Sequence, residues 1–88
     1  MSYTVVWHAE AEDELAQIWL EYAPQSSITS AANRIDELLR AQPTEVGESR
    51  PNDRRILLVP PLGVTYRVRQ PDRFVHVLRV WYYEGPKE

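Results

Sequence analysis

The second half of the chain contains three strand-like runs whose connections leave room only for tight turns. Residues 54–59, 64–69 and 74–81 are rich in β-branched and aromatic side chains, which are typical of strands. The sequences "PPLG" (60–63) and "QPDR" (70–73) join the runs, and their proline, glycine and aspartate residues favour turns. Parallel strands need a crossover of a dozen or more residues, so strands joined this closely pair antiparallel. The sequence therefore predicts an antiparallel meander.

The first half of the chain predicts one strand followed by two amphipathic helices. Residues 3–8 ("YTVVWH") are β-branched and aromatic, which indicates a strand. Residues 9–22 and 27–41 carry apolar side chains at helical spacing, and Pro24 and Pro43 end these two helices. The apolar stripes consist of Ala11, Leu15, Ile18, Trp19 and Tyr22 in the first helix, and of Ile28, Ala32, Ile35, Leu38 and Leu39 in the second.

Polar residues mark where the helices begin and where regular structure is interrupted. The acids Glu10, Glu12, Asp13 and Glu14 lie in the first turns of the first helix, where the helix dipole favours anions. Ser26 and Ser27 offer N-caps for the second helix. Residues 43–53 ("PTEVGESRPND") have no periodicity and predict a loop of about eleven residues, a length that often carries function.

These elements predict a single α+β domain over residues 1–88, in the order β-α-α-β-β-β. Neither helix can bury its stripe alone, so we expect a two-layer fold with the helical hairpin on one face of an antiparallel sheet. The other face stays open. The chain lacks cysteine, and its longest apolar stretch, residues 56–64, is too short and too rich in proline to span a bilayer. Because the start turns acidic without a basic region, we expect a cytoplasmic protein.

Charge is divided unevenly along the chain. Residues 1–48 carry nine acids and two arginines, whereas residues 49–88 carry eight bases and four acids. The net charge of −3 at pH 7 makes the whole chain a poor general binder of nucleic acid. A local basic face can still attract phosphates or an acidic peptide.

The register of the last two strands decides which side chains share a face. If Gln70 pairs with Phe74, the arginines gather on one face, and the core-facing set is Val64, Tyr66, Val68, Phe74, Leu78 and Val80. Thr65, Val75 and Val77 would then accompany Arg67, Arg69 and Arg79. If Gln70 pairs with Arg73 instead, Arg79 moves to the other face, because a slip of one residue flips every side chain. We favour the first register because it collects the apolar residues on one side.

The chain resembles the RelE/ParE superfamily of toxins from type II toxin-antitoxin systems, the plasmid-stabilisation type. The resemblance covers nearly the whole chain, and it is carried by patterns and not by a catalytic signature. These patterns are "YTVVWHAEAEDEL" (3–15), "AANRIDELLRAQP" (31–43), "GESR" (47–50) and "VTYRVRQPDRFVHVLRVWYY" (64–83). The resemblance implies a RelE/ParE-like fold and a growth-inhibiting toxin.

The same resemblance implies partners. A cognate antitoxin would wrap and inactivate the toxin, and the target would be either mRNA on the ribosome or DNA gyrase. We expect no cofactor, no metal and no membrane association, and either a monomer or a toxin-antitoxin hetero-oligomer. The alternative is a non-catalytic interaction module of the same fold that binds an acidic partner peptide. A short acidic or amphipathic protein encoded in the neighbouring reading frame would favour the toxin.

RNA cleavage by 2′-OH attack needs a base, cations beside the phosphate and an acid for the leaving oxygen. By resemblance to the nucleases of the superfamily, the candidate catalytic residues are Arg54, Arg55, Arg67, Arg79 and Tyr83. The arginine that those nucleases place at the start of the third strand is replaced here by Gly63 and Val64. No basic residue accompanies the tyrosines after the fourth strand. We therefore expect weak or no RNA cleavage.

A partner-binding surface is the second candidate site. Its residues are Arg67, Arg69, Arg79 and Tyr82. Solubility of an exposed sheet face explains such arginines equally well. Only one of Tyr82 and Tyr83 can join them, because neighbouring strand residues point to opposite faces. His76, with only His8 as a companion, is expected to be a packing or surface residue and not a metal ligand.

Overall fold

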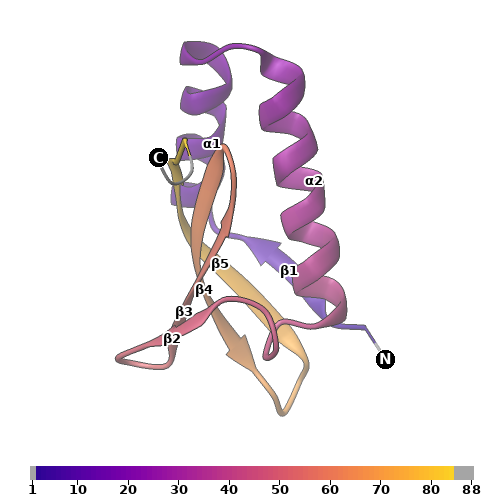
Figure 1. Ribbon diagram of the computed structural model, residues 1–88. Coiled ribbons are helices and arrows are strands. Elements are labelled where there is room, and N and C mark those ends of the chain that lie inside the picture. Colours follow the sequence, from indigo (N-terminus) through magenta and orange to yellow (C-terminus); the bar gives the residue numbers. More distant parts are fainter. Residues whose placement is uncertain (1, 85–88) are drawn as a thin grey trace.

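Two helices cover one face of a five-stranded sheet in the computed structural model, which describes residues 2–84 (Figure 1). The helices form a hairpin, and a short hairpin of strands projects from the far edge of the sheet. The elements are β1 (Thr4–Trp7), α1 (Ala9–Glu21), α2 (Gln25–Ala41), β2 (Glu48–Arg50), β3 (Arg54–Val59), β4 (Leu62–Arg69) and β5 (Phe74–Tyr82). The α+β two-layer prediction is confirmed.

The sheet is mixed, with the strand order β1-β5-β4-β3-β2. Strands β3 to β5 form the predicted antiparallel meander, which β2 extends, whereas β1 runs parallel to β5 at the edge. Thr4 to Trp7 pair with Phe74 to Val77, so the first strand joins the last. The segment expected to be a loop, residues 43–53, contains the additional strand β2. This strand is three residues long and fully exposed, too short to show periodicity in the sequence.

Helix α1 ends at Glu21, one residue before the expected Tyr22. Helix α2 ends at Ala41, as predicted, but it begins two residues before the expected Ser27. Its N-cap is Pro24, and no side chain caps the helix, so the prediction of serine caps was wrong. Proline suits this position because it lacks an N–H group and its backbone is already extended. Neither helix in residues 2–84 has the length and hydropathy of a membrane span.

The core lies between the helices and the sheet. It combines the apolar stripes of α1 and α2 with alternate residues of β3, β4 and β5. Burying these side chains is the main driving force of folding, at about 25 cal/mol per Å² of apolar surface. The buried residues are Ala11, Ile18, Ile28, Ala31, Ile35, Leu39, Leu57, Leu62, Val64, Tyr66, Val75, Val77 and Val80.

The pairing of β4 with β5 contains both of the registers considered from the sequence. Near the turn, Arg69 pairs with Phe74, which is the alternative register; beyond Tyr66, Thr65 pairs with Arg79, which is the favoured one. The ladder shifts between these pairs, so Leu78 is an extra, bulged residue in β5. The bulge keeps Arg67, Arg69 and Arg79 on one face, as expected.

The bulge also corrects the prediction for the residues near the turn. Val75 and Val77 are fully buried in the core, whereas the sequence placed them with the arginines. Phe74 pairs with Arg69 and lies on the arginine face instead. A single extra residue reverses the alternation of β5, so both ends of the strand bury their valines.

Candidate functional site

A row of basic side chains crosses the sheet on the face that the helices leave uncovered, the open face. In register, Arg50 of β2 lies beside Arg54 of β3, Arg54 beside Arg67 of β4, and Arg67 beside His76 of β5. Directly paired residues of neighbouring strands point to the same face. We call these four residues the basic row.

Two members of the basic row lack a compensating charge. Arg50 lies 3.2 Å from a carboxylate oxygen of Glu48, but Arg54 and Arg67 form no ion pair within residues 2–84. Like charges directly opposite one another on neighbouring strands are destabilising. The like charges of the row are therefore expected to oppose folding.

Arg69 continues the basic face toward the β4–β5 turn. Its guanidinium lies 3.6 Å from Asp72, and both side chains are more than half exposed. A pair this exposed contributes little to stability and opens readily. Arg69 is therefore an accessible cation on this face.

Arg79 shares the open face but is held by an acid of α1. Its Nε and Nη2 atoms donate to Glu14 Oε2 at 2.9 and 2.6 Å, and the backbone N–H of Val80 donates to Glu14 Oε1 at 2.9 Å. These hydrogen bonds from Arg79, together with that from Val80, hold the pKa of Glu14 below its usual range despite the cost of desolvation. One carboxylate thus anchors the bulge of β5 to α1, and Arg79 is only partly available to a ligand.

Arg55 lies on the opposite face from Arg54 and binds the loop before β2. Its guanidinium donates to the carbonyl oxygens of Val46 and Gly47 and to Ser49 Oγ, at 2.8 to 3.3 Å. Arg55 Nε also lies 3.3 Å from the Tyr66 hydroxyl. The arginine therefore ties the loop before β2 to the sheet, and the structure does not bring it together with the other candidate arginines.

The buried Tyr66 completes this attachment of the loop. Its hydroxyl lies 2.7 Å from the carbonyl oxygen of Pro43 and 2.8 Å from that of Val46. Burial raises the pKa of the Tyr66 phenol, although the nearby Arg55 opposes the shift. Gly47 lies against both groups at φ 74°, and a Cβ there would come within 2.7 Å of the Ile56 carbonyl oxygen. Only glycine fits this turn.

The two tyrosines at the end of β5 lie apart from the basic row. Tyr82 faces the helices and stacks on Tyr22, with ring centroids 3.8 Å apart and planes at 6°, so it does not join the arginine face. The backbone N–H of Tyr83 donates to Pro61 O at 2.7 Å. Pro61 precedes Arg67 by six residues, or roughly 20 Å along a strand. Tyr83 is thus far from Arg54 and Arg67.

Sequence reasoning missed one close pair on the open face, His8 with His76. Their Nε2 and Nδ1 atoms are 3.0 Å apart. They are separated by 68 positions and meet because β1 pairs in parallel with β5. The sequence of the edge strand β1 gave no signal of its partner strand. Residues 2–84 contain no cluster of three histidine or acidic side chains suited to hold a metal ion.

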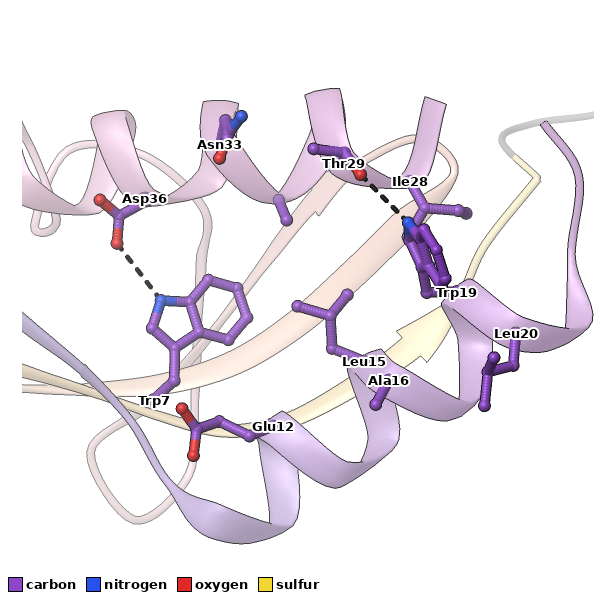
Figure 2. A pocket seen from close by; sticks show the side chains of 11 residues that line it. Trp7, Glu12, Leu15, Ala16, Trp19, Leu20, Ile28, Thr29, Asn33 and Asp36 are labelled. Carbon is purple, nitrogen blue, oxygen red and sulfur yellow. Dashed lines mark hydrogen bonds between the residues drawn. The ribbon is translucent and has the colours of Figure 1, made fainter. Parts of the chain in front are cut away.

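A second candidate site is an apolar groove of about 690 Å³ between α1 and α2 (Figure 2). Leu15 points into the groove between the two helices, and Trp7 and Trp19 lie toward its two ends. The indole N–H groups of the two tryptophans donate to Asp36 Oδ1 and Thr29 Oγ1, both at 3.2 Å. The tryptophans are therefore held in fixed orientations as walls of the groove.

The rim of this groove is unusually apolar for a protein surface. Leu20 is 69% exposed and Trp19 is 39% exposed, and both line the groove. Glu12 adds negative charge to the rim, whereas Asp36 is paired with Arg40 of the same helix. A concave apolar surface with exposed large side chains is typical of a protein-docking site.

Comparison with known proteins links this fold to one family. The family model for the ParE toxin of the type II toxin-antitoxin system parDE matches residues 5–84. Among curated proteins, none matches the chain.

Several solved structures share the fold at low sequence identity. The toxin-antitoxin complex RelBE2 from Mycobacterium tuberculosis matches with a TM-score of 0.79 at 19% identity, covering 97% of this chain and 95% of that chain. A chromosomal ParDE toxin-antitoxin system from P. aeruginosa matches with a TM-score of 0.69 at 17% identity, covering 93% and 97%. The isolated E. coli RelE toxin matches with a TM-score of 0.67 at 17% identity, covering 97% and 88%.

Proposed function

The chain belongs to the ParE toxin family of type II toxin-antitoxin systems, and on that basis we propose that it arrests growth by blocking DNA gyrase and not by cutting mRNA. We further propose that a cognate antitoxin neutralises it by occupying the groove between α1 and α2. The dispersal of the candidate cleavage residues over the molecule carries the first proposal. The exposed apolar rim of the groove carries the second.

RNA cleavage requires its acid, base and cations to meet at one phosphate. Arg54 and Arg67 are adjacent, but Arg55 faces the loop before β2 with its donors engaged, and Tyr83 lies roughly 20 Å along the sheet from Arg67. Arg79 is neutralised by Glu14. An arrangement this dispersed favours inhibition by binding over strand cleavage.

The target is tested by assaying the purified chain against both candidates. We expect inhibition of negative supercoiling by gyrase, and no codon-positioned cuts in mRNA on translating ribosomes. The opposite pattern, with cuts lost in Arg67→Ala or Tyr83→Phe, would contradict the proposal. A chain that affects neither gyrase nor mRNA would contradict it as well.

The groove suits an amphipathic helix from the antitoxin. Its apolar walls, including Leu15 and Leu20, would receive the apolar stripe of such a helix, as in other helix-in-groove complexes. Glu12 on the rim would favour lysine or arginine beside that stripe. The open face, with its unpaired arginines, would suit an acidic segment of the same antitoxin.

Antitoxin docking is tested with Leu20→Glu, because this side chain is mostly exposed and its replacement leaves the core intact. We expect the dissociation constant for the antitoxin to rise by about tenfold or more, which is about 1.4 kcal/mol, measured by calorimetry. The matched control is Ser30→Glu, which adds the same charge to an exposed position of α2 outside the groove. Equal affinities of the two variants would place the antitoxin elsewhere.

A further inference from the structure

The two walls of the groove between α1 and α2 differ in polarity. The α1 wall is apolar from Leu15 to Leu20, and its one acid, Glu12, lies toward the Trp7 end. The α2 wall carries three polar side chains along its length, and these are Thr29, Asn33 and Asp36 (Figure 2). Helix residues three and four positions apart are neighbours on one face, so these three form a line along the groove.

The two outer members of this line are already engaged within the chain. Thr29 Oγ1 accepts the indole N–H of Trp19 at 3.2 Å. Asp36 Oδ1 accepts the indole N–H of Trp7 at 3.2 Å, and Asp36 Oδ2 pairs with Arg40. Thr29 and Asp36 therefore hold the tryptophan walls in place.

Asn33 lies between these two residues and is not engaged. Its side chain is exposed and has no hydrogen-bond partner within residues 2–84. A carboxamide offers two N–H donors and one carbonyl acceptor. Asn33 is thus the group in the middle of the α2 wall that is free to hydrogen-bond to a ligand.

A helix docked in the groove would change the surroundings of this amide. In the free chain the exposed Asn33 can hydrogen-bond to solvent, whereas a docked helix would exclude that solvent. A buried donor or acceptor without a partner weakens binding. For this reason, a site that hydrogen-bonds a ligand rejects analogues that lack the matching group, and it does so more strongly than an apolar pocket rejects a change of size.

We propose that Asn33 determines which antitoxin the chain accepts, by requiring a hydrogen-bonding side chain in the middle of the apolar stripe of the docked helix. An asparagine, glutamine or serine at that position would satisfy the amide. A helix with leucine there, or one docked a turn out of register, would leave the amide without a partner. Single buried asparagines set partner and register in coiled coils in the same way. This inference rests on the proposed docking of the antitoxin in the groove.

The first experiment measures the dissociation constant of the purified neighbouring gene product by calorimetry. We expect Asn33→Leu to raise the dissociation constant about tenfold or more, because the polar side chain of the docked helix loses its partner. The matched control, Ser30→Leu, places the same side chain at an exposed position of α2 outside the groove and should bind like wild type. Because Asn33 and Ser30 are both exposed, neither change disturbs the core, which circular dichroism would verify.

The second experiment identifies the matching residue of the antitoxin. The neighbouring gene product is displayed on yeast with each position of its apolar stripe randomised in turn, and cells are selected for binding to labelled wild type or to Asn33→Leu. We expect one central position to select polar side chains against wild type and aliphatic side chains against Asn33→Leu. The flanking positions should stay apolar in both selections.

The inference is overturned if folded Asn33→Leu binds as tightly as wild type or more tightly, or if both selections yield the same residues at every position. Leu20→Glu separates this inference from the docking proposal. If Leu20→Glu weakens binding and Asn33→Leu does not, the antitoxin lies in the groove but Asn33 does not select it. If neither variant weakens binding, both proposals are wrong.

Discussion

Arg54 and Arg67 lie directly opposite each other on neighbouring antiparallel strands, and neither has an acidic partner within residues 2–84. A cross-strand pair of equal charges opposes folding, and Arg50 beside Arg54 adds a third cation to the same row. Acids are abundant in this chain, yet they lie mostly in the first half and on the helices. The cations of this row are therefore expected to lower the stability of the fold.

The first prediction concerns the loss of stability caused by these like charges. Arg54→Gln or Arg67→Gln should raise the free energy of unfolding by about 0.2 to 1 kcal/mol at low salt, because each removes a like-charge pair. The gain should shrink at about 1 M salt, where charges are screened. Urea denaturation at the two salt concentrations measures the effect, with Arg34→Gln on α2 as the control. A loss of stability in both row variants would contradict this account.

The second prediction concerns Glu14 and pH. Its pKa is lowered in the folded state, so its contribution to stability is present above the unfolded pKa and disappears as pH falls through the folded pKa. Glu14→Gln should destabilise the chain at neutral pH by about 0.5 to 1 kcal/mol, since the amide still accepts from Val80. The variant should also lose less stability than wild type on acidification below about pH 4.5. Thermal unfolding of both proteins across this pH range measures the effect. If Glu14 were unimportant, the melting temperatures of wild type and variant would change in parallel with pH.

The third prediction separates Arg55 from Arg54. Arg55→Ala should lower the free energy of unfolding by about 2 kcal/mol, because the carbonyl oxygens of Val46 and Gly47 lose a charged donor. Arg55→Lys should recover only part of this loss, since an ammonium group cannot reproduce the planar fork. Arg54→Ala, one position earlier, should not destabilise. Equal stabilities of Arg54→Ala and Arg55→Ala would show that the attachment of the loop is not important.

The fourth prediction concerns the antitoxin. Reversal of Arg67 and Arg69 to glutamate should weaken antitoxin binding and flatten its salt dependence, because both side chains are exposed on the open face. Calorimetry at two salt concentrations measures both effects, with circular dichroism as the folding control. If the folded double variant binds the antitoxin with the same affinity as wild type at both salt concentrations, these arginines only keep the exposed face of the sheet soluble.

The helices and the meander could be predicted because their patterns are local. The stripe of α1 and the turns around Gly63 and Gln70 are visible within a few residues. The bulge at Leu78 could not be predicted, because no local pattern shows that Glu14 of α1 accepts a hydrogen bond from the Val80 N–H group beside it. The extra residue, Leu78, determines which valines of β5 are buried.

The positions of the candidate site residues could be predicted only in part, because some of their contacts join residues far apart in the sequence. Arg54 and Arg67 were expected on one surface, and the register places them side by side. Arg55 was expected beside Arg54, but alternation along β3 turns it toward the loop before β2. The pairing of His8 with His76 depends on β1 reaching the far side of β5, which no local pattern indicates.

The central claim, that this chain is a growth-arresting toxin neutralised by a cognate antitoxin, is tested most directly by growth. The measurement is the growth rate of bacterial cultures that express the wild-type chain, the wild-type chain together with its neighbouring gene product, or the folded variant Arg54→Gln/Arg67→Gln. We expect arrest in the first culture and normal growth in the second, with weakened arrest in the third. Normal growth in the first culture, despite accumulation of folded protein, would contradict the claim and identify the chain as a non-toxic interaction module.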